Sequence, residues 1–251
     1  MKMQIQVRVD APNPTYAAMV LEQFGGANGE LKAALQYLVQ SFGVTDRVVR
    51  DLLMDISTEE LNHLELVGTL VSKFLSPIHR GTDDGTADPR LQRAADMWRG
   101  ADSTVQKMLI LGGGGPLVTD AAGVPFSGTY INSTGDLVAD LASDIAAELR
   151  AKRVYEILYR EIHDRGARQM FDFLIQREEQ HSSLFMEARE RTQDMGVTRD
   201  FQDTRFSRRY PEFSSPRDDH ERFRYGRQSE PLHGPSDPDE VRVNLAHMPR
   251  R

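Results

Sequence analysis

Residues 60–63 read ELNH, and residues 178–181 read EEQH. In each stretch a glutamate stands three positions before a histidine. Three residues is close to one helical turn, so both side chains of a pair lie on the same face of a helix. The two pairs are 118 residues apart, and this repetition indicates that two helices contribute to one site.

The repeat extends beyond the two pairs. A glutamate stands 30 residues before each pair, and a tyrosine follows each of these glutamates by seven residues. Seven residues is about two turns, so each tyrosine lies on the face of its own glutamate, where its hydroxyl can hydrogen-bond a carboxylate. The first half of the repeat is Glu30, Tyr37, Glu60 and His63, and the second is Glu148, Tyr155, Glu178 and His181.

The spacing of apolar residues predicts four long helices. They form two hairpins separated by a long crossover, residues 77–132. This is the outline of a ferritin-like four-helix bundle, so we expect an all-α fold with the bundle over 14–197. The helices are expected over about 15–43 with an interruption at Gly25–Gly26 and Gly29, from Thr45 or Asp46 to near Ser76–Pro77, over about 134–163 after an N-cap at Ser133 or Thr134, and from Asp164–Gly166 to about 195.

The segments outside the helices differ in composition. Residues 1–13 alternate in polarity, which predicts an extended arm or a short strand. In the crossover, the glycine run 112–115 is not followed by the lysine of a P-loop, so it predicts a loop and hairpin, and 88–98 has helical spacing. Residues 198–251 hold six of the 12 prolines and six aromatic residues. We expect an extended arm that docks on the core or on a neighbouring subunit, with a disordered tail as the alternative.

Composition excludes several classes of protein. The formal net charge of −7 argues against non-specific nucleic-acid binding, which needs a basic surface. No apolar run approaches the roughly 18–20 residues of a membrane span, and no secretory signal precedes the helices. The sequence has no cysteine, which excludes thiolate metal sites and thiol catalysis. We expect a soluble, cytoplasmic protein.

The repeated glutamates and histidines indicate a dinuclear metal site. Four carboxylates that converge in an apolar core would repel one another unless cations held them. Two divalent metals offset about four negative charges, and two imidazoles complete the coordination. Carboxylate oxygen and imidazole nitrogen without sulfur suit manganese or iron.

These motifs resemble those of the manganese catalases, which are non-haem catalases. The similarity covers about residues 14–195 and rests on GELKAALQYLVQ, RDLLMDISTEELNHLE, LGGGGP, YINSTGDLVADLASDIAAE and REEQH, in that order. It implies a ferritin-like bundle with N- and C-terminal arms, assembled as a homohexamer. It also implies dismutation of hydrogen peroxide to water and dioxygen, a defence against oxidative stress, at two manganese ions that alternate between Mn(II)₂ and Mn(III)₂.

The resemblance assigns unequal roles to the two halves of the repeat. Glu60 would bridge the two ions, whereas Glu178 would stay off the metals and carry protons as a catalytic residue. Tyr37 would donate a hydrogen bond to Glu30, and Tyr155 is its counterpart. The implied metal ligands are Glu30, Glu60, His63, Glu148 and His181.

The sequence departs from the family pattern at two places. Some members have a basic residue directly before the third ligand, where this chain has Ala147; Arg150 or Lys152 could replace it, although a solvated position is the more ordinary one for both. Asp51 and Asp55 match acidic residues that bind calcium in some members. The tail has no Asn-x-Ser-x-Gly segment to complete that site, so a solvated or salt-bridged pair is equally expected.

Two other functions use the same features. A ferritin-like di-iron oxidase or peroxidase would have the same ligands, although the absence of cysteine pairs argues against a rubrerythrin-like peroxidase. A structural, coat-type relative would keep the fold with little catalysis. The intact ligand set favours the enzyme.

Overall fold

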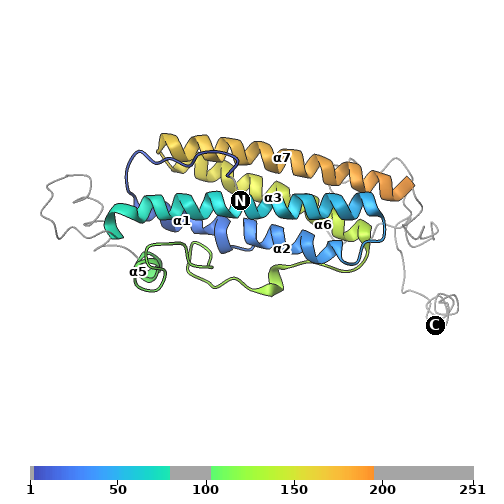
Figure 1. Cartoon of the computed structure of the whole chain (residues 1–251), viewed down its shortest axis with the longest axis horizontal. Helices are drawn as coiled ribbons and strands as arrows, with labels where there is room; N and C mark the ends of the chain where they lie inside the picture. Colours follow the sequence, from blue (N-terminus) through green and yellow to red (C-terminus); the bar gives the residue numbers. More distant parts are fainter. Residues whose placement is uncertain (1–2, 80–102, 195–251) are drawn as a thin grey trace, which may run out of the picture. The chain divides into compact units, whose positions relative to one another are not determined.

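The computed structural model describes residues 3–79 and 103–194 (Figure 1). Within these ranges the chain forms helices and no strand, so the predicted all-α, ferritin-like bundle is confirmed. The elements are α1 (Pro14–Gly25), α2 (Glu30–Ser41), α3 (Arg47–His79), α5 (Ser103–Ile110), the short 3₁₀ helix η1 (Gly128–Tyr130), α6 (Leu137–Glu161) and α7 (Arg165–Asp194).

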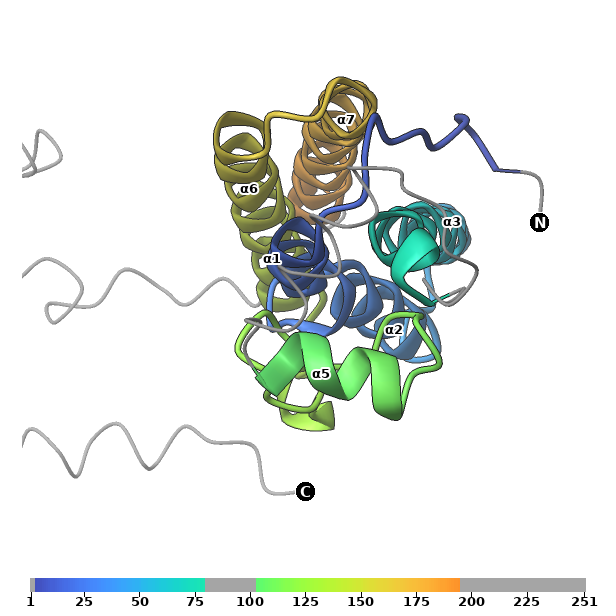
Figure 2. The same cartoon turned by 90° about the vertical axis from the view of Figure 1, so that its left-hand side faces the viewer.

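Four helical positions make the bundle. The helices α1 and α2 follow one another along one edge and pack on α3, while α6 packs on α7. Viewed along the bundle, α5 lies outside the four positions, and it packs on α1 (Figure 2). The predicted interruption of the first helix is therefore real. A side chain at Gly29 would place its Cβ 2.7 Å from the carbonyl oxygen of Gln23, so the break needs a glycine there.

Polar side chains start the helices on both sides of the bundle. The Asn13 side chain accepts a hydrogen bond from the Tyr16 backbone N–H and caps α1. The N-cap of α6 is Asp136, whose carboxylate accepts from two backbone N–H groups, so the expected cap at Ser133 or Thr134 is wrong. Gly135 has a φ of 76° and turns the chain, which leaves the Thr134 hydroxyl to donate to Asp140 instead.

The fourth helix begins close to its predicted start. The Asp164 carboxylate accepts from the backbone N–H of Ala167 at 2.9 Å and from that of Asp10 at 2.7 Å. It therefore caps α7 and also holds the N-terminal segment. Residues 3–13 form neither a helix nor a strand, and Val7 within them is buried.

The second long helix extends beyond its predicted end. The helix α3 continues past Pro77 to His79, two residues beyond the expected end near Ser76–Pro77. A proline removes one helical hydrogen bond. In a helix of 33 residues that packs on α1 and α2, this loss falls in the last turn and does not stop the helix sooner.

The apolar core is divided into two clusters along the bundle. One contains Leu66, Leu70 and Phe74 of α3 together with Phe171 of α7. The other contains Leu53 and Ile56 of α3, Leu141 of α6 and Phe185 of α7. On both α3 and α7, the predicted metal ligands lie between these clusters in sequence. The bundle therefore carries a polar layer between two apolar ones.

The crossover has the predicted loop and hairpin after the glycine run. Thr119 and Pro125 form an antiparallel bridge, and the Phe126 N–H donates to the Val118 carbonyl at 2.9 Å. The helix α5 was not predicted. The expected helical patch 88–98 and the C-terminal arm 198–251 lie outside the described residues. No helix in the described ranges is long and apolar enough to cross a membrane.

Candidate metal centre

The polar layer brings together the six acidic and imidazole side chains of the repeat. Each is at most 1% exposed. They come from four helices: Glu30 from α2, Glu60 and His63 from α3, Glu148 from α6, and Glu178 and His181 from α7.

Helix geometry explains the position of each side chain. Glu60 and His63 lie in the middle of α3, one turn apart, and the pair on α7 has the same spacing. Glu148 lies in the middle of α6. Glu30 is different because it is the first residue of α2, directly after the glycine break. A carboxylate at a helix N-terminus is stabilised by the positive end of the helix dipole.

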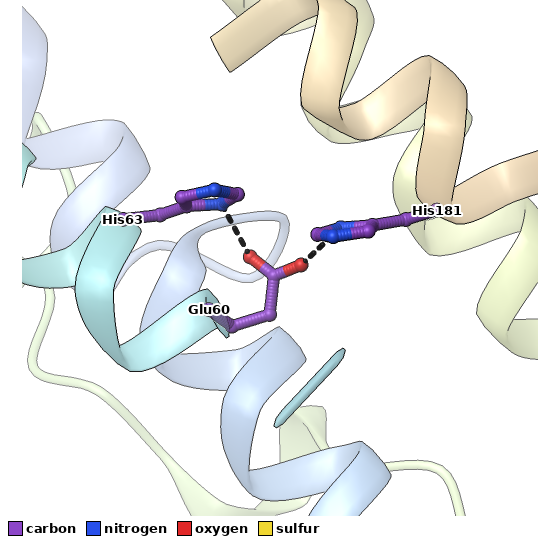
Figure 3. Close-up of side chains that lie close together, drawn as sticks. All are labelled: Glu60, His63 and His181. Atoms are coloured by element: carbon purple, nitrogen blue, oxygen red, sulfur yellow. Dashed lines mark hydrogen bonds and ion pairs between the residues drawn. The ribbon is translucent and has the colours of Figure 1, made fainter. Parts of the chain in front are cut away.

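Glu60 lies at the centre of the site (Figure 3). Its Oε2 is 3.0 Å from Nδ1 of His63, and its Oε1 is 2.7 Å from Nδ1 of His181. The two imidazole rings stack across it with centroids 5.6 Å apart. One carboxylate therefore faces both histidines, one oxygen to each.

Besides the trio of Glu60, His63 and His181, the donor atoms form two overlapping groups of four residues. In each group, one oxygen or nitrogen from every member lies within 4.8 Å of the others. Glu60 and Glu178 belong to both groups. The remaining members are one glutamate and one histidine from each half of the molecule: Glu30 and His63 in the first group, Glu148 and His181 in the second. This is the arrangement that two neighbouring cations need.

Several donor atoms lack a hydrogen-bond partner within the described chain. They include Oε1 of Glu60, Oε2 of Glu148, Oε1 of Glu178 and Nδ1 of His181. The short contact between His181 Nδ1 and Glu60 Oε1 is thus close without being aligned as a hydrogen bond. A buried polar atom without a partner costs about 1–3 kcal/mol. Cations between these atoms would remove that cost, so the residues fit a pair of metal ions, and oxygen and nitrogen donors suit manganese or iron.

Burial and mutual repulsion act on the glutamates. Burial, followed by the charge of Glu60, raises the pKa of Glu30 to about 8. The pKa of Glu178 is raised well above its ordinary value by burial and then by Glu60, Glu30 and Glu148. Without metal, the Glu30 carboxyl group therefore holds a proton at neutral pH.

The histidines respond in the opposite sense. Burial alone would lower the pKa of His181, but the Glu60 carboxylate and hydrogen bonds to neighbouring glutamates raise it to about 11. The pKa of His63 is raised well above its ordinary value by the same balance. The two imidazolium charges in turn hold the pKa of Glu60 below its ordinary value, against the effect of burial. Metal binding must displace these protons.

The two tyrosines hydrogen-bond the glutamates of the opposite half. The Tyr37 hydroxyl donates to Glu148, and the Tyr155 hydroxyl donates to Glu30. The expected bond from Tyr37 to Glu30 is therefore wrong. Seven residues of helix rise about 10.5 Å, too far for a hydroxyl to reach a carboxylate on its own helix. The antiparallel packing of α2 and α6 places each tyrosine opposite the other glutamate.

Glu59 is a further site residue that the sequence interpretation missed. Its Oε2 is 3.1 Å from Nε2 of His181, and its Oε1 is 3.5 Å from Nε2 of His63. Arg177 donates to Oε1 of Glu59 at 2.7 Å. Burial would raise the pKa of Glu59, but hydrogen bonds to His181, His63 and Arg177 lower it well below its ordinary value. One carboxylate thus orients both histidines through the nitrogens that face away from Glu60.

A signal for Glu59 was present in the sequence. Glu59 is the residue directly before the ELNH motif. Arg177 stands 118 residues later, directly before the EEQH motif, at the equivalent position of the second half. The opposite charges at equivalent positions form an ion pair with each other.

Arg150 and Lys152, the two basic residues that could replace the one missing at Ala147, make contacts away from the metal centre. Lys152 forms an ion pair with Glu179 at 3.3 Å, and Arg150 donates to Asn28 at 2.9 Å. Both contacts lie at the surface of the bundle. Neither residue serves as the cation next to the metal ligands.

The acidic pair on α3 lies on the surface. Asp51 and Asp55 are both exposed, and Asp51 is 3.6 Å from Arg50 in an ion pair. Within the described ranges, the acidic and imidazole groups that could hold an ion all belong to the buried centre.

Comparison with known proteins gives one consistent family. Residues 1–235 match the family model of manganese-containing catalases. The chain is 41% identical over 212 residues to a probable manganese catalase of Clostridium acetobutylicum, covering 84% of this chain and 87% of the relative. It is 40% identical over 189 residues to protein CotJC of Bacillus subtilis, covering 74% of this chain and 89% of the relative. A crystal structure of KatB, a manganese catalase from Anabaena PCC7120, superposes with a TM-score of 0.73 at 32% identity, covering 93% and 97% of the two chains.

Proposed function

Because the chain belongs to the manganese-containing catalase family, we propose that it dismutates hydrogen peroxide to water and dioxygen at two manganese ions. The observation that carries this proposal is the pair of overlapping donor groups, each with its own glutamate and histidine and both with Glu60 and Glu178. A single ion would use one group and leave unpartnered buried atoms in the other.

The metal ligands follow from the two groups. Glu30 and His63 would hold one ion, Glu148 and His181 would hold the other, and Glu60 would be shared by both. When bound, the two ions would accept two electrons from one peroxide and return them to the next, alternating between Mn(III)₂ and Mn(II)₂.

Glu178 would carry the protons of the reaction. Oxidation of one peroxide to dioxygen releases two protons and two electrons, and reduction of the next to two waters consumes the same number. A residue that accepts and returns these protons must lie close to the bound peroxide. Glu178 is buried, and its carboxylate lies within 4.8 Å of donor atoms of both glutamate–histidine pairs, so it is close enough to the centre to exchange protons there. These features support the assignment.

The surrounding side chains would hold the ligands in place. Tyr37 and Tyr155 each donate to a ligand glutamate, which fixes the orientation of its carboxylate. Glu59 hydrogen-bonds Nε2 of His181 and lies 3.5 Å from Nε2 of His63, so it would help to direct Nδ1 of each ring towards the ions. Such partners commonly alter metal affinity by about 10–100-fold.

Oxygen evolution tests the proposal directly. Purified protein from manganese-supplied cells should contain about two manganese ions per chain by elemental analysis and should release dioxygen from peroxide. His181→Ala should abolish this release, whereas Glu187→Ala, on the exposed side of α7, should retain it. Equal rates in wild type and His181→Ala would show that this site is not the catalyst.

The same experiment separates the two alternatives. A di-iron oxidase or peroxidase would contain iron and would release no dioxygen. A structural relative of the family would release none even with manganese bound at both positions.

Three finer predictions accompany the function. A hexamer is expected from the family resemblance, and the exposed apolar side chains Val39, Phe42 and Val48 at the α2–α3 turn support assembly; light scattering would measure it. A calcium ion at Asp51 and Asp55 stays a prediction, which calcium analysis of the assembled protein would test. Location in the cytoplasm also stays a prediction.

A further inference from the structure

A buried hydrogen-bond network joins α2 to α6 beside the metal centre. Gln36 and Gln40 lie one turn apart on α2, and the amide of each donates to Oδ1 of Asp144 on α6, at 2.7 and 2.9 Å. All three residues are at most 3% exposed. Two donors from one helix therefore meet on a single oxygen of the other. We call these three residues the α2–α6 network.

The same two glutamines hold the segment that leads into α6. The Asn132 backbone N–H donates to Oε1 of Gln36 at 2.9 Å, and the Asn132 carbonyl accepts from Nε2 of Gln40 at 2.9 Å. Both backbone groups of this residue are thus bonded to α2. The α2–α6 network therefore fixes α2 against α6 and against the end of the crossover.

The network shares its helix register with the bonds of the two tyrosines. Tyr37 directly follows Gln36 on α2, and its hydroxyl donates to Glu148. Three residues forward on α2 and four residues back on α6, Gln40 meets Asp144. The other tyrosine bond lies seven residues back on α2 and seven residues forward on α6. All of these bonds therefore need the same antiparallel register.

Buried hydrogen bonds specify such a register. A fully bonded polar network favours one arrangement of the helices that it joins, because a buried donor or acceptor that loses its partner destabilises the fold. A shift of α2 along α6 would separate both glutamines from Asp144. The same shift would move the Tyr37 hydroxyl away from Glu148, so the network opposes a movement that would disturb a metal-ligand candidate.

A second buried aspartate on α6 makes different contacts. Asp140 lies one turn before Asp144 and is 5% exposed. Its carboxylate accepts from the backbone N–H and the hydroxyl of Thr134 and from the backbone N–H of Gly135. These bonds hold the turn before α6 and do not reach α2. Of the two aspartates, Asp144 is the one that joins α6 to α2.

We propose that Asp144 is a positioning residue for the metal centre. Through Gln36 and Gln40 it keeps α2 at the register where Tyr37 orients the Glu148 carboxylate towards the ions. The role depends on the acceptor oxygen of Asp144 that binds both glutamines. It rests on the proposed function, because Glu148 needs this orientation only as a metal ligand.

Manganese binding to metal-free protein tests this role, measured by competition with a chelator. Asp144→Ala should lower manganese affinity about tenfold, the smaller effect expected for residues that orient metal ligands. Asp144→Asn keeps an acceptor oxygen for the two glutamines and should stay close to wild type. Oδ2 of Asp144 has no hydrogen-bond partner in the part of the chain that is described, so an amide nitrogen there breaks no bond. If Asp144→Asn loses as much affinity as Asp144→Ala, the proposal is wrong.

Asp140→Ala is the matched control. It removes a buried carboxylate from the same face of α6, so it should lower the stability of metal-free protein to urea, as Asp144→Ala should. It should leave manganese affinity close to wild type, because it leaves the α2–α6 network intact. A loss of affinity as large as that of Asp144→Ala would show that loosening of α6 is sufficient, and would overturn the proposal.

A double-variant cycle separates positioning from general stability. If Asp144 acts through Tyr37, the loss of affinity caused by Asp144→Ala should largely disappear in protein that already carries Tyr37→Phe. A residue that only stabilised the fold would cause the same loss in both backgrounds. Equal losses would therefore contradict the proposal.

Gln40→Met provides the test if Asp144→Ala does not fold. It removes one of the two donors to Asp144 and keeps the bond from Gln36. Manganese affinity should fall by less than in Asp144→Ala, and the fall should again depend on the Tyr37 hydroxyl. Unchanged affinity would contradict the proposal. Failure of the proposed function would instead be seen in wild type, as absence of manganese binding or of dioxygen release.

Discussion

The half of the molecule built from α1, α2 and α3 and the half built from α6 and α7 supply the same ligands in different surroundings. Each provides one glutamate, one Glu-x-x-His pair and one tyrosine, with all positions offset by 118 residues. In the first half the glutamate begins a helix after a glycine break, whereas in the second it lies within an unbroken helix. The two halves therefore present equivalent donor residues on different helical scaffolds.

The differences lie in the residues around the ligands. Glu59 and Arg177 occupy equivalent positions and pair with each other, and Lys32 is buried where its equivalent, Arg150, is exposed. Glu59 contacts both histidines. Because one Glu59 contacts the histidines of both halves, the second half needs no equivalent glutamate. The two halves therefore differ in the residues that surround the metal-binding side chains.

The largest effect is expected for Glu60, which both halves share. Glu60→Ala removes one donor from each of the two groups, so both ions should be lost and dioxygen release should fall to background. Elemental analysis of purified protein measures the manganese per chain. Glu179→Ala, at an exposed side chain of α7, is the matched control. Retention of one ion in Glu60→Ala would show that this residue belongs to one half alone.

A smaller loss is expected at Glu59. Glu59→Gln keeps the size of the side chain but removes the charge that orients both imidazoles, and manganese affinity should fall about 10–100-fold. Arg177→Met keeps Glu59 but removes the hydrogen bonds that Arg177 donates to it, so manganese affinity should fall by less. Titration against a metal chelator measures both affinities. The interpretation fails if the two variants bind manganese as tightly as wild type.

The pH dependence of manganese binding follows from the shifted pKa values. In the metal-free protein the pKa of His181 is about 11 and that of Glu30 about 8, so both hold protons at pH 7 that manganese must displace. Affinity should therefore rise between about pH 6 and 8, by up to about tenfold per unit for each displaced proton. Chelator competition at several pH values measures it, and a flat profile would contradict the protonated cluster.

Whereas manganese affinity should rise with pH, the stability of the metal-free fold should fall as pH rises. A histidine with a raised pKa stabilises the fold fully below its unfolded value, 6.5, and this contribution is lost as pH rises towards the folded value of about 11. Glu30, also with a raised pKa, acts in the same sense. Urea unfolding of metal-free protein should thus show lower stability at pH 9 than at pH 6.5. His181→Ala should reduce that difference.

The smallest effects are expected for the tyrosines. Loss of either hydroxyl leaves a buried carboxylate without its donor, at about 1–3 kcal/mol of unfolding free energy. Because the bonds cross between halves, Tyr37→Phe should couple energetically with Glu148→Gln and be additive with Glu30→Gln. Urea unfolding of the single and double variants gives the coupling. Coupling to Glu30 instead would mean that each tyrosine serves its own half.

The spacing of the buried glutamates and histidines is local, so the sequence predicted that they lie together. Glu60 with His63, and Glu178 with His181, are fixed one turn apart by the helix itself, and the repetition of the pattern predicted that the two pairs meet. The spacing did not identify Lys32 or Glu59, since a lysine or a second glutamate on a helix is ordinarily solvated.

The amino-acid sequence alone determined which side chains share a face, because 3.6 residues per turn sets that geometry within any helix. It therefore determined the bundle, the break before Glu30 and the donor set. Only the tertiary structure decided which helix face packs against which face of a neighbouring helix. The antiparallel packing of α2 and α6 exchanged the partners of Tyr37 and Tyr155, because contacts between helices depend on their packing and not on spacing along either chain segment.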